Sequence, residues 1–295
     1  MRRLAIRHED LIGTFEQKKA AIAQLNLMDD IFFSVVMEHN DAAEYLLTQL
    51  LGKPVRIIEN KTQYSIRNIE DHSVVLDALI EDEEHNIYDV EVQIGDKDNH
   101  ERRLRYYRTA IDWSYLEKGI DFSKLPEVYM IFISDFDPFD KEKNYYEIKE
   151  YVEGFDLQYN DGVHRLYFNT AVKDGSGLSK LLQYFAYSDP LNGDFGALSQ
   201  QVKYHKIQNE GVDFMSSAFK NAMYEYGKEC EEKGKLEGKL EGKLEGKLEG
   251  LIEGETKGKV DTVKNMLKKN MSFETALDLA GIDRQTYEKY AATER

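Results

Sequence analysis

The chain has 295 residues, of which 41% are hydrophobic, and its formal net charge is −16 with an isoelectric point near 5.0. This length allows one large domain with additions, and the acidity excludes passive, non-specific binding of polyanions, so any contact with nucleic acid needs a local basic patch. The single cysteine, Cys230, excludes a disulfide framework and a cysteine-ligated zinc site, and the lack of a signal peptide or long apolar run predicts a cytoplasmic protein.

The N-terminal part is expected to lead into an apolar core. Residues 1–25 are polar and predict a partly helical lead-in, whereas residues 28–37 are mostly apolar and begin the core. A helix is predicted from residue 41 to residue 51, with Asp41 as its N-cap and Gly52 as its stop. A short strand should follow at residues 55–58.

Two β-branched, alternating segments separated by a polar stretch predict a β-hairpin. The segments are residues 73–80 and 88–94, and the polar turn between them is centred near Glu84. That centre pairs residue 77 with residue 91. Side chains that face each other across two strands lie about 4.5–5.5 Å apart at Cβ, so Asp77 and Glu91 should be neighbours.

Alternation along the second strand of this hairpin separates a polar face from an apolar one. Asp89, Glu91 and Gln93 share one face, and the register adds Asp77 to it. Two adjacent carboxylates repel each other unless a proton or a cation lies between them, and a hard divalent cation with oxygen ligands suits such a pair. The competing interpretation is that these acids face solvent, as acids on strands commonly do.

The remaining elements of the predicted domain alternate between helices and strands, which is typical of a mixed α/β layer arrangement. An uninterrupted apolar run at 126–134 is typical of a buried strand. The predicted elements after the hairpin are a helix at 100–116, strands at 126–134, 145–151 and 163–169, and a helix at 175–187.

The helix that follows the hairpin is basic within an acidic chain. Residues 97–108 carry a local net charge of +3. Arg102 and Arg105 share one helical face with Arg108 nearby, so they are candidates to hold phosphates beside the acidic face, and the rings of Tyr106 and Tyr107 could stack on bases. The alternatives are that the arginines neutralise nearby acids and that the tyrosines pack on the sheet.

A fourfold Lys-Leu-Glu-Gly repeat occupies residues 235–250. Each helical glycine costs about 1 kcal/mol relative to alanine, and like charges lie four residues apart, so an isolated helix would be weak. Three interpretations remain open: a linker-like helix, a helix that forms a homodimer through residues 211–259, and a disordered tether.

The C-terminal tail predicts two capped helical pieces. Ser272 can cap the first piece, Gly281 ends it, and Asp283 can cap the second. The pattern is typical either of a minimal helix-turn-helix or of a small helical cap without a nucleic-acid role.

The order of these segments resembles the recombination-promoting nucleases, also described as PD-(D/E)XK nuclease family transposases. The resemblance rests on the order of five segments over about residues 26–150, with weaker similarity to about 210. They are Met28-Asp-Asp-Ile-Phe-Phe, Glu44-Tyr-Leu-Leu-Thr-Gln-Leu-Leu, Asp77, Tyr88-Asp-Val-Glu-Val-Gln93 and Arg102-Arg-Leu-Arg-Tyr-Tyr-Arg108.

The resemblance implies a restriction-endonuclease-like core, a mixed sheet flanked by helices, followed by a long helical segment and a small helical tail. The implied divisions are a nuclease domain at 26–210, a helical linker at 211–259 and a C-terminal module at 260–295. Asp77 and Glu91 match the positions that hold Mg²⁺ (or Mn²⁺). Gln93 stands where such cores commonly carry a lysine that orients the attacking water; it donates a hydrogen bond but carries no charge.

The leading hypothesis is therefore a Mg²⁺-dependent DNA endonuclease that promotes recombination or mobile-element activity. Asp77 and Glu91 would bind the metal, Gln93 would position water, and Arg102, Arg105 and Arg108 would bind DNA. Because glutamine is uncharged, a helix arginine such as Arg105 could compensate for the missing lysine. The alternative hypothesis is a non-catalytic scaffold that self-associates through its C-terminal helix.

Overall fold

The protein consists of two compact units, described here from a computed structural model that covers residues 13–67, 73–95, 97–116, 119 and 121–292. The first unit ends at Met223, and the second begins at Tyr224. None of the helices in these ranges is both long and apolar enough to cross a membrane. The lead-in expected at residues 1–25 is described only from residue 13 onward.

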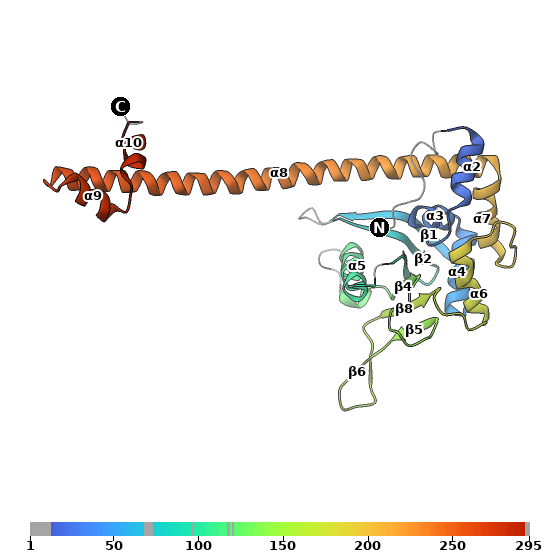
Figure 1. Ribbon diagram of the computed structural model, residues 1–295. Coiled ribbons are helices and arrows are strands. Elements are labelled where there is room, and N and C mark those ends of the chain that lie inside the picture. The colour runs from blue at the N-terminus through green and yellow to red at the C-terminus, as the bar shows by residue number, and fades with distance from the viewer. Residues whose placement is uncertain (1–12, 68–72, 96, 117–118, 120, 293–295) are drawn as a thin grey trace. The chain divides into compact units, whose positions relative to one another are not determined.

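A six-stranded sheet with the order β1-β2-β3-β4-β8-β5 forms the centre of the first unit (Figure 1). The pairs β1–β2 and β2–β3 are antiparallel, the pairs β3–β4 and β4–β8 are parallel, and β5 returns antiparallel to β8. The strands are β1 (Ile57–Arg67), β2 (Ser73–Asp82), β3 (Ile87–Gln93), β4 (Val128–Ser134), β5 (Tyr145–Ile148) and β8 (Val163–Asn169).

Helices cover the two faces of the sheet unequally. One face packs on a large cluster of side chains from α2 (Phe15–Ala23), α3 (Asp30–Met37), α4 (Asn40–Leu51), α6 (Gly177–Tyr187) and α7 (Gly196–Ile207). The other face packs on a smaller cluster to which α5 (His100–Tyr115) contributes Leu104 and Ile111. The mixed sheet flanked by helices agrees with a restriction-endonuclease-like fold.

Local sequence signals fixed the ends of several elements correctly. Gly52 ends α4 in the left-handed region at φ +66°, as predicted. However, the predicted N-cap of this helix was wrong, because His39 occupies the N-cap and Asp41 lies in the first turn. The strand expected at 145–151 is divided as well. β5 ends at Ile148, and β6 (Glu150–Tyr151) instead pairs with β7 (Gln158–Tyr159) in a separate hairpin.

The second unit contains most of one long helix and two short ones. α8 (Asn209–Lys268) is a continuous helix of 60 residues that includes the whole Lys-Leu-Glu-Gly repeat. The predicted caps of the tail are confirmed: Ser272 accepts a hydrogen bond from Thr275 at the start of α9 (Phe273–Ala280), and Asp283 accepts one from Thr286 in α10 (Arg284–Ala292). Val263 packs with residues of α9 in a small apolar cluster.

Candidate functional site

The predicted register of the β2–β3 hairpin is confirmed. Ala78 lies opposite Val90 and Leu79 opposite Asp89, so the next positions along the strands are residues 77 and 91. The ladder of regular backbone pairs ends at Ala78 and Val90, at the point where the two predicted acids begin.

A break in the β1–β2 pair aims Asp77 at the α5 side of the sheet. Val74 and Leu76 of β2 pack on the α5 side, whereas Ala78 and Ile80 pack on the opposite side, so the alternation of faces changes at residue 77. The position across from Asp77 on β1 is Gln63, which has a left-handed backbone (φ 46°) and interrupts the regular pairing. Such irregularities re-aim side chains and commonly occur next to active sites.

Asp77 and Glu91 bridge the gap where the ladder stops. The Asp77 backbone N–H donates to Glu91 Oε1 at 3.0 Å, and the Val92 backbone N–H donates to Asp77 Oδ2 at 3.0 Å. Both side chains are buried. The two carboxylates therefore hold β2 and β3 together in place of backbone carbonyls.

Asp89 is a third buried acid beside this pair. Its side chain is fully buried, and within the described residues no N–H or hydroxyl group donates to either carboxylate oxygen, although the Glu91 carboxyl is close enough to share a proton with it. It lies two positions before Glu91 on β3 and so on the same face. An unpaired buried carboxylate is costly, which makes this group the least satisfied of the three.

Burial and mutual repulsion raise the pKa values of all three acids. Burial, assisted by the charge of Asp30 on α3, raises the pKa of Asp77 to about 7, against the opposing effects of the Val92 N–H and the Arg103 charge. Burial and then the charge of Asp77 raise the pKa values of Asp89 and Glu91 well above the ordinary range. A proton or a cation is therefore needed to neutralise this cluster.

Gln93 completes the polar face and meets an arginine from α5. Its Oε1 accepts a hydrogen bond from the Arg103 guanidinium, and its Nε2 donates to the Ile94 carbonyl at 3.1 Å. Tyr107, four residues after Arg103, is half-buried beside the acids, and burial followed by the charge of Glu91 raises its pKa. We call Asp77, Asp89, Glu91, Gln93, Arg103 and Tyr107 the acid cluster.

The three arginines predicted to contact DNA differ in their surroundings. Arg102 and Arg105 are exposed on the outside of α5. Arg108 is half-buried and forms ion pairs with Asp112 at 2.7 Å and with Asp161 at 3.8 Å. Sequence reasoning assigned no role to Arg103, although it is the arginine that reaches the acid cluster. Its four-residue spacing from Tyr107 is the signal that links the two on one helical face.

The donor set suits a hard divalent cation, although the side chains are not arranged as a finished coordination shell. Three buried carboxyl groups with raised pKa values need a positive counter-charge, and oxygen ligands are those that Mg²⁺ and Ca²⁺ prefer. Among the described residues, no three His, Cys, Asp or Glu side chains already converge as metal ligands. Asp77 and Glu91 each use one oxygen, Oδ2 and Oε1 respectively, to accept a backbone N–H, which leaves the second oxygen of each carboxylate for a cation.

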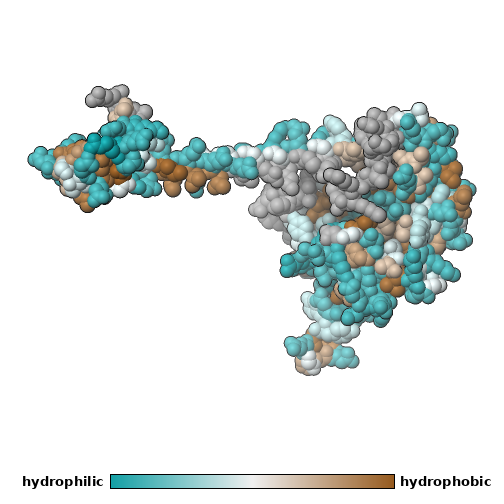
Figure 2. Space-filling model, in the orientation of Figure 1, coloured by the Kyte–Doolittle hydropathy of each residue, from teal (hydrophilic) through white to brown (hydrophobic). Residues whose placement is uncertain are grey.

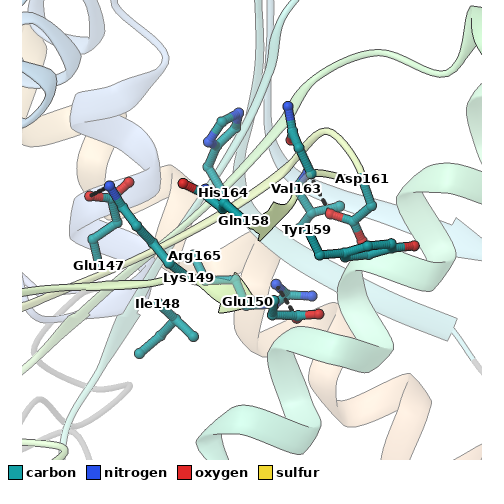
Figure 3. Close-up of a pocket in the computed structure, with 11 residues that line it drawn as sticks. Glu147, Ile148, Lys149, Glu150, Gln158, Tyr159, Asp161, Val163, His164 and Arg165 are labelled. Atoms are coloured by element: carbon teal, nitrogen blue, oxygen red, sulfur yellow. Dashed lines mark hydrogen bonds and ion pairs between the residues drawn. The ribbon is translucent and has the colours of Figure 1, made fainter. Parts of the chain in front are cut away.

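A separate small pocket lies between β5, β8 and the β6–β7 hairpin (Figure 3). It encloses about 20 Å³, which is room for roughly one water molecule. His164 and Arg165 of β8 line it, and Arg165 forms an ion pair with Glu150 at 2.9 Å. None of its lining residues belongs to the acid cluster, so the pocket is no candidate for the same chemistry.

Comparison with known proteins identifies the region that contains this site. Residues 32–173 match the sequence profile of a family described as PD-(D/E)XK nuclease family transposase. The matched region includes every member of the acid cluster. No curated protein and no solved structure matches the chain.

Proposed function

We propose that this chain, whose residues 32–173 form a PD-(D/E)XK nuclease family transposase domain, is a Mg²⁺-dependent DNA endonuclease. The observation that carries the proposal is the buried acid cluster at the break in the β2–β3 ladder. Three buried carboxyl groups on one sheet face, inside the matched region, contribute little to the stability of a fold, and their oxygens are suited to hold a cation.

Asp77, Glu91 and Asp89 are the residues that would hold Mg²⁺ or Mn²⁺. The bound metal would polarise the scissile phosphate and lower the pKa of a water molecule. Asp77 and Glu91 are the expected ligands from the sequence, and Asp89 adds a third oxygen donor, which lies within hydrogen-bonding reach of the Glu91 carboxyl.

Gln93 and Arg103 together would take the place of the lysine that such sites commonly contain. Arg103 donates to Gln93 Oε1 and Gln93 Nε2 donates one hydrogen to the Ile94 carbonyl, which fixes the amide and leaves its second N–H as a donor. The guanidinium supplies the positive charge that glutamine lacks. Gln93 would therefore position water while Arg103 offsets the charge that develops on the phosphate.

The proposed substrate is DNA, and the proposed location of the protein is the cytoplasm. Arg102 and Arg105 would hold the phosphate backbone, because exposed arginines form charge-assisted hydrogen bonds to phosphate. Cleavage would create the broken ends from which recombination or the movement of a mobile element can begin.

Cleavage of supercoiled plasmid in Mg²⁺ tests the proposal. We expect the wild-type protein to nick plasmid and both Asp77→Asn and Asp89→Asn to lose at least about 100-fold in rate, the typical scale for removing an electrostatic catalytic group. The matched control is Asp156→Asn, which changes an exposed acid in the turn between β6 and β7 and should leave the rate unchanged. Equal nicking by all four proteins would refute the proposal.

One observation favours the alternative of a non-catalytic scaffold: Asp77 and Glu91 already act as acceptors that join two strands. Thermal unfolding separates the two functions. A metal-binding protein gains stability in millimolar Mg²⁺ or Mn²⁺, because a ligand that binds only the folded state stabilises it, and Asp89→Asn should abolish the gain. Absence of any shift with either ion would support the scaffold.

Self-association through α8 is a further part of the proposal. Leu244 and Leu248 are 70% and 60% exposed, and apolar side chains lie uncovered along this helix (Figure 2). In each repeat the leucine is flanked by Lys on one side and Glu on the other, about 100° away in each direction. In a parallel pair each Lys row faces the partner's Glu row, whereas an antiparallel pair would oppose like charges. The occupant of this face is therefore a second copy in parallel orientation.

Disulfide trapping tests this orientation. Leu244→Cys in a Cys230→Ser background should cross-link rapidly under mild oxidation, because residue 244 faces its own copy in a parallel, in-register pair. Leu279→Cys, an exposed position on α9, is the control and should form no disulfide cross-link. A monomer by light scattering at tens of micromolar protein, with no cross-link at residue 244, would exclude the pair.

A further inference from the structure

The outward face of α5 carries a row of cationic and aromatic side chains. At about 100° per residue, five of its positions fall within an arc of roughly 100°. The members of this outer row are Arg102, Arg105, Tyr106, Thr109 and Trp113. Its helical spacing is as regular as that of the buried face, which carries Leu104 and Ile111 on the opposite side of the same helix.

The two rings of the outer row are open to solvent. Tyr106 is 46% exposed and Trp113 is 54% exposed. Within the described part of the chain, neither ring stacks on another aromatic ring or lies over a cation. Trp113 is also the only tryptophan among the 295 residues. Two large rings that keep about half of their surface in solvent on one face of α5 contribute little to the core and are available to a ligand.

The arginines of the row are also available. Arg102 and Arg105 are exposed and take part in no ion pair within the described residues, in contrast to Arg108, which pairs with two acids. Exposed rings interleaved with free guanidinium groups are the combination that binds unpaired bases, because the rings stack on base faces while the cations contact the phosphates. Such a face reads no donor or acceptor pattern and therefore tolerates any base sequence.

The outer row lies next to the acid cluster on the same helix. Arg103 is about 60° around the helix from Tyr106, and Arg103 contacts Gln93 of the cluster. From residue 102 to residue 113 the helix rises about 16 Å, which is enough to contact several successive nucleotides. A strand held along the outer row would therefore pass the edge of α5 that leads to the acids.

We propose that Tyr106 and Trp113 stack on unpaired bases, so that the substrate class is single-stranded DNA or DNA with locally unpaired bases. In a duplex the faces of the bases are covered by their neighbours and are unavailable to an aromatic side chain. Binding by the outer row stands on its own, whereas cleavage of the bound strand rests on the function proposed above.

Fluorescence of Trp113 tests the stacking directly, because no other tryptophan contributes to the emission. The full-length protein in EDTA is titrated with a 12-nucleotide oligothymidylate and, separately, with a mixed-sequence duplex of the same length. We expect saturable quenching by the single strand and an affinity at least about tenfold lower for the duplex. Equal quenching by the duplex, or no quenching by the single strand, would overturn the proposal.

Substitutions then assign the binding to the row. By fluorescence anisotropy of a labelled oligothymidylate, Trp113→Ala and Tyr106→Ala should each weaken binding roughly tenfold, within the usual range for loss of one base–aromatic stack. Trp113→Phe keeps a ring and should recover most of the affinity. The control is Tyr187→Ala, a 66% exposed ring on α6, which should bind as the wild type does. Wild-type affinity in both alanine variants would refute the inference.

The outcomes for binding and for cleavage are separable. Asp89→Asn should quench with single-stranded DNA as the wild type does while losing cleavage. If the wild-type protein shows quenching without cleavage, the proposed endonuclease activity is refuted and binding by the outer row is supported. If the protein cleaves plasmid but does not bind oligothymidylate, binding by the outer row is refuted and the endonuclease activity is supported.

Discussion

The raised pKa of Asp77 predicts that the metal-free protein loses stability as the pH rises. Burial raises this pKa from 3.8 to about 7. Between these values the folded protein holds a proton that the unfolded chain has released, so the free energy of unfolding must fall with increasing pH. A rise of about 3 pKa units corresponds to about 4 kcal/mol, of which about 3 kcal/mol is lost between pH 5 and pH 8.

Urea unfolding followed by Trp113 fluorescence measures this loss in the first unit alone, since no other tryptophan exists. The measurement is made in EDTA at pH 5 to 8 on the wild type and on Asp77→Asn, whose amide oxygen can still accept the Val92 N–H. Carboxylates with lowered pKa values, such as Asp82 and Asp137, make the protein more stable as the pH rises. They do so mainly below pH 5 and equally in both proteins.

The difference between the two proteins reports the titration of Asp77 together with its coupling to Asp89 and Glu91, whose pKa values the charge of Asp77 raises. Between pH 5 and pH 8 we expect the free energy of unfolding of the wild type to fall by about 3 kcal/mol more than that of Asp77→Asn. Mg²⁺ should restore stability at pH 8 more than at pH 5, because metal ligands must be deprotonated. A difference that stays constant across this range would refute the assignment of a strongly raised pKa to Asp77.

Further substitutions test the roles assigned to other residues. Arg103→Ala should lower the plasmid cleavage rate at saturating DNA by at least about tenfold, whereas Arg105→Ala should weaken DNA binding and leave the saturated rate unchanged. Gly52→Ala should lower the free energy of unfolding in urea by about 1–2 kcal/mol, because φ is +66°, although no neighbour obstructs a Cβ. Gly250→Ala, at an open position of α8, should raise the helicity measured by circular dichroism. Ser272→Ala should destabilise the second unit by about 1 kcal/mol, measured by its thermal midpoint, because α9 loses its cap.

The β2–β3 hairpin could be predicted from the sequence because its information is local. Alternation of apolar and polar residues, together with the polar turn centred on Glu84, determined the register and with it the neighbourhood of Asp77 and Glu91. The caps of the tail were predictable for the same reason, since Ser272 and Asp283 bond to backbone groups only three residues away.

Features that depend on distant segments could not be read from the sequence. Asp30 is 47 positions before Asp77 in the chain, and only the packing of α3 on the sheet brings its charge to bear. Four arginines within seven residues of α5 left its rotation on the sheet undetermined, so Arg105 was expected to compensate Gln93 where Arg103 makes the contact. The divided strand after Ile148 has the same origin, because pairing partners decide where each segment ends.

The bonds from Asp77 and Glu91 to backbone amides use one oxygen of each carboxylate. Asp77 Oδ2 accepts the Val92 N–H and Glu91 Oε1 accepts the Asp77 N–H, which leaves Oδ1 and Oε2 as the oxygens through which a cation could be held while the two strands stay joined. Hydrogen exchange at those two amides therefore reports the binding mode without substrate or turnover. Exchange that stays slow when the ion is added means that the strand bonds and the metal coexist, whereas faster exchange means that the ion takes the oxygens that join β2 to β3.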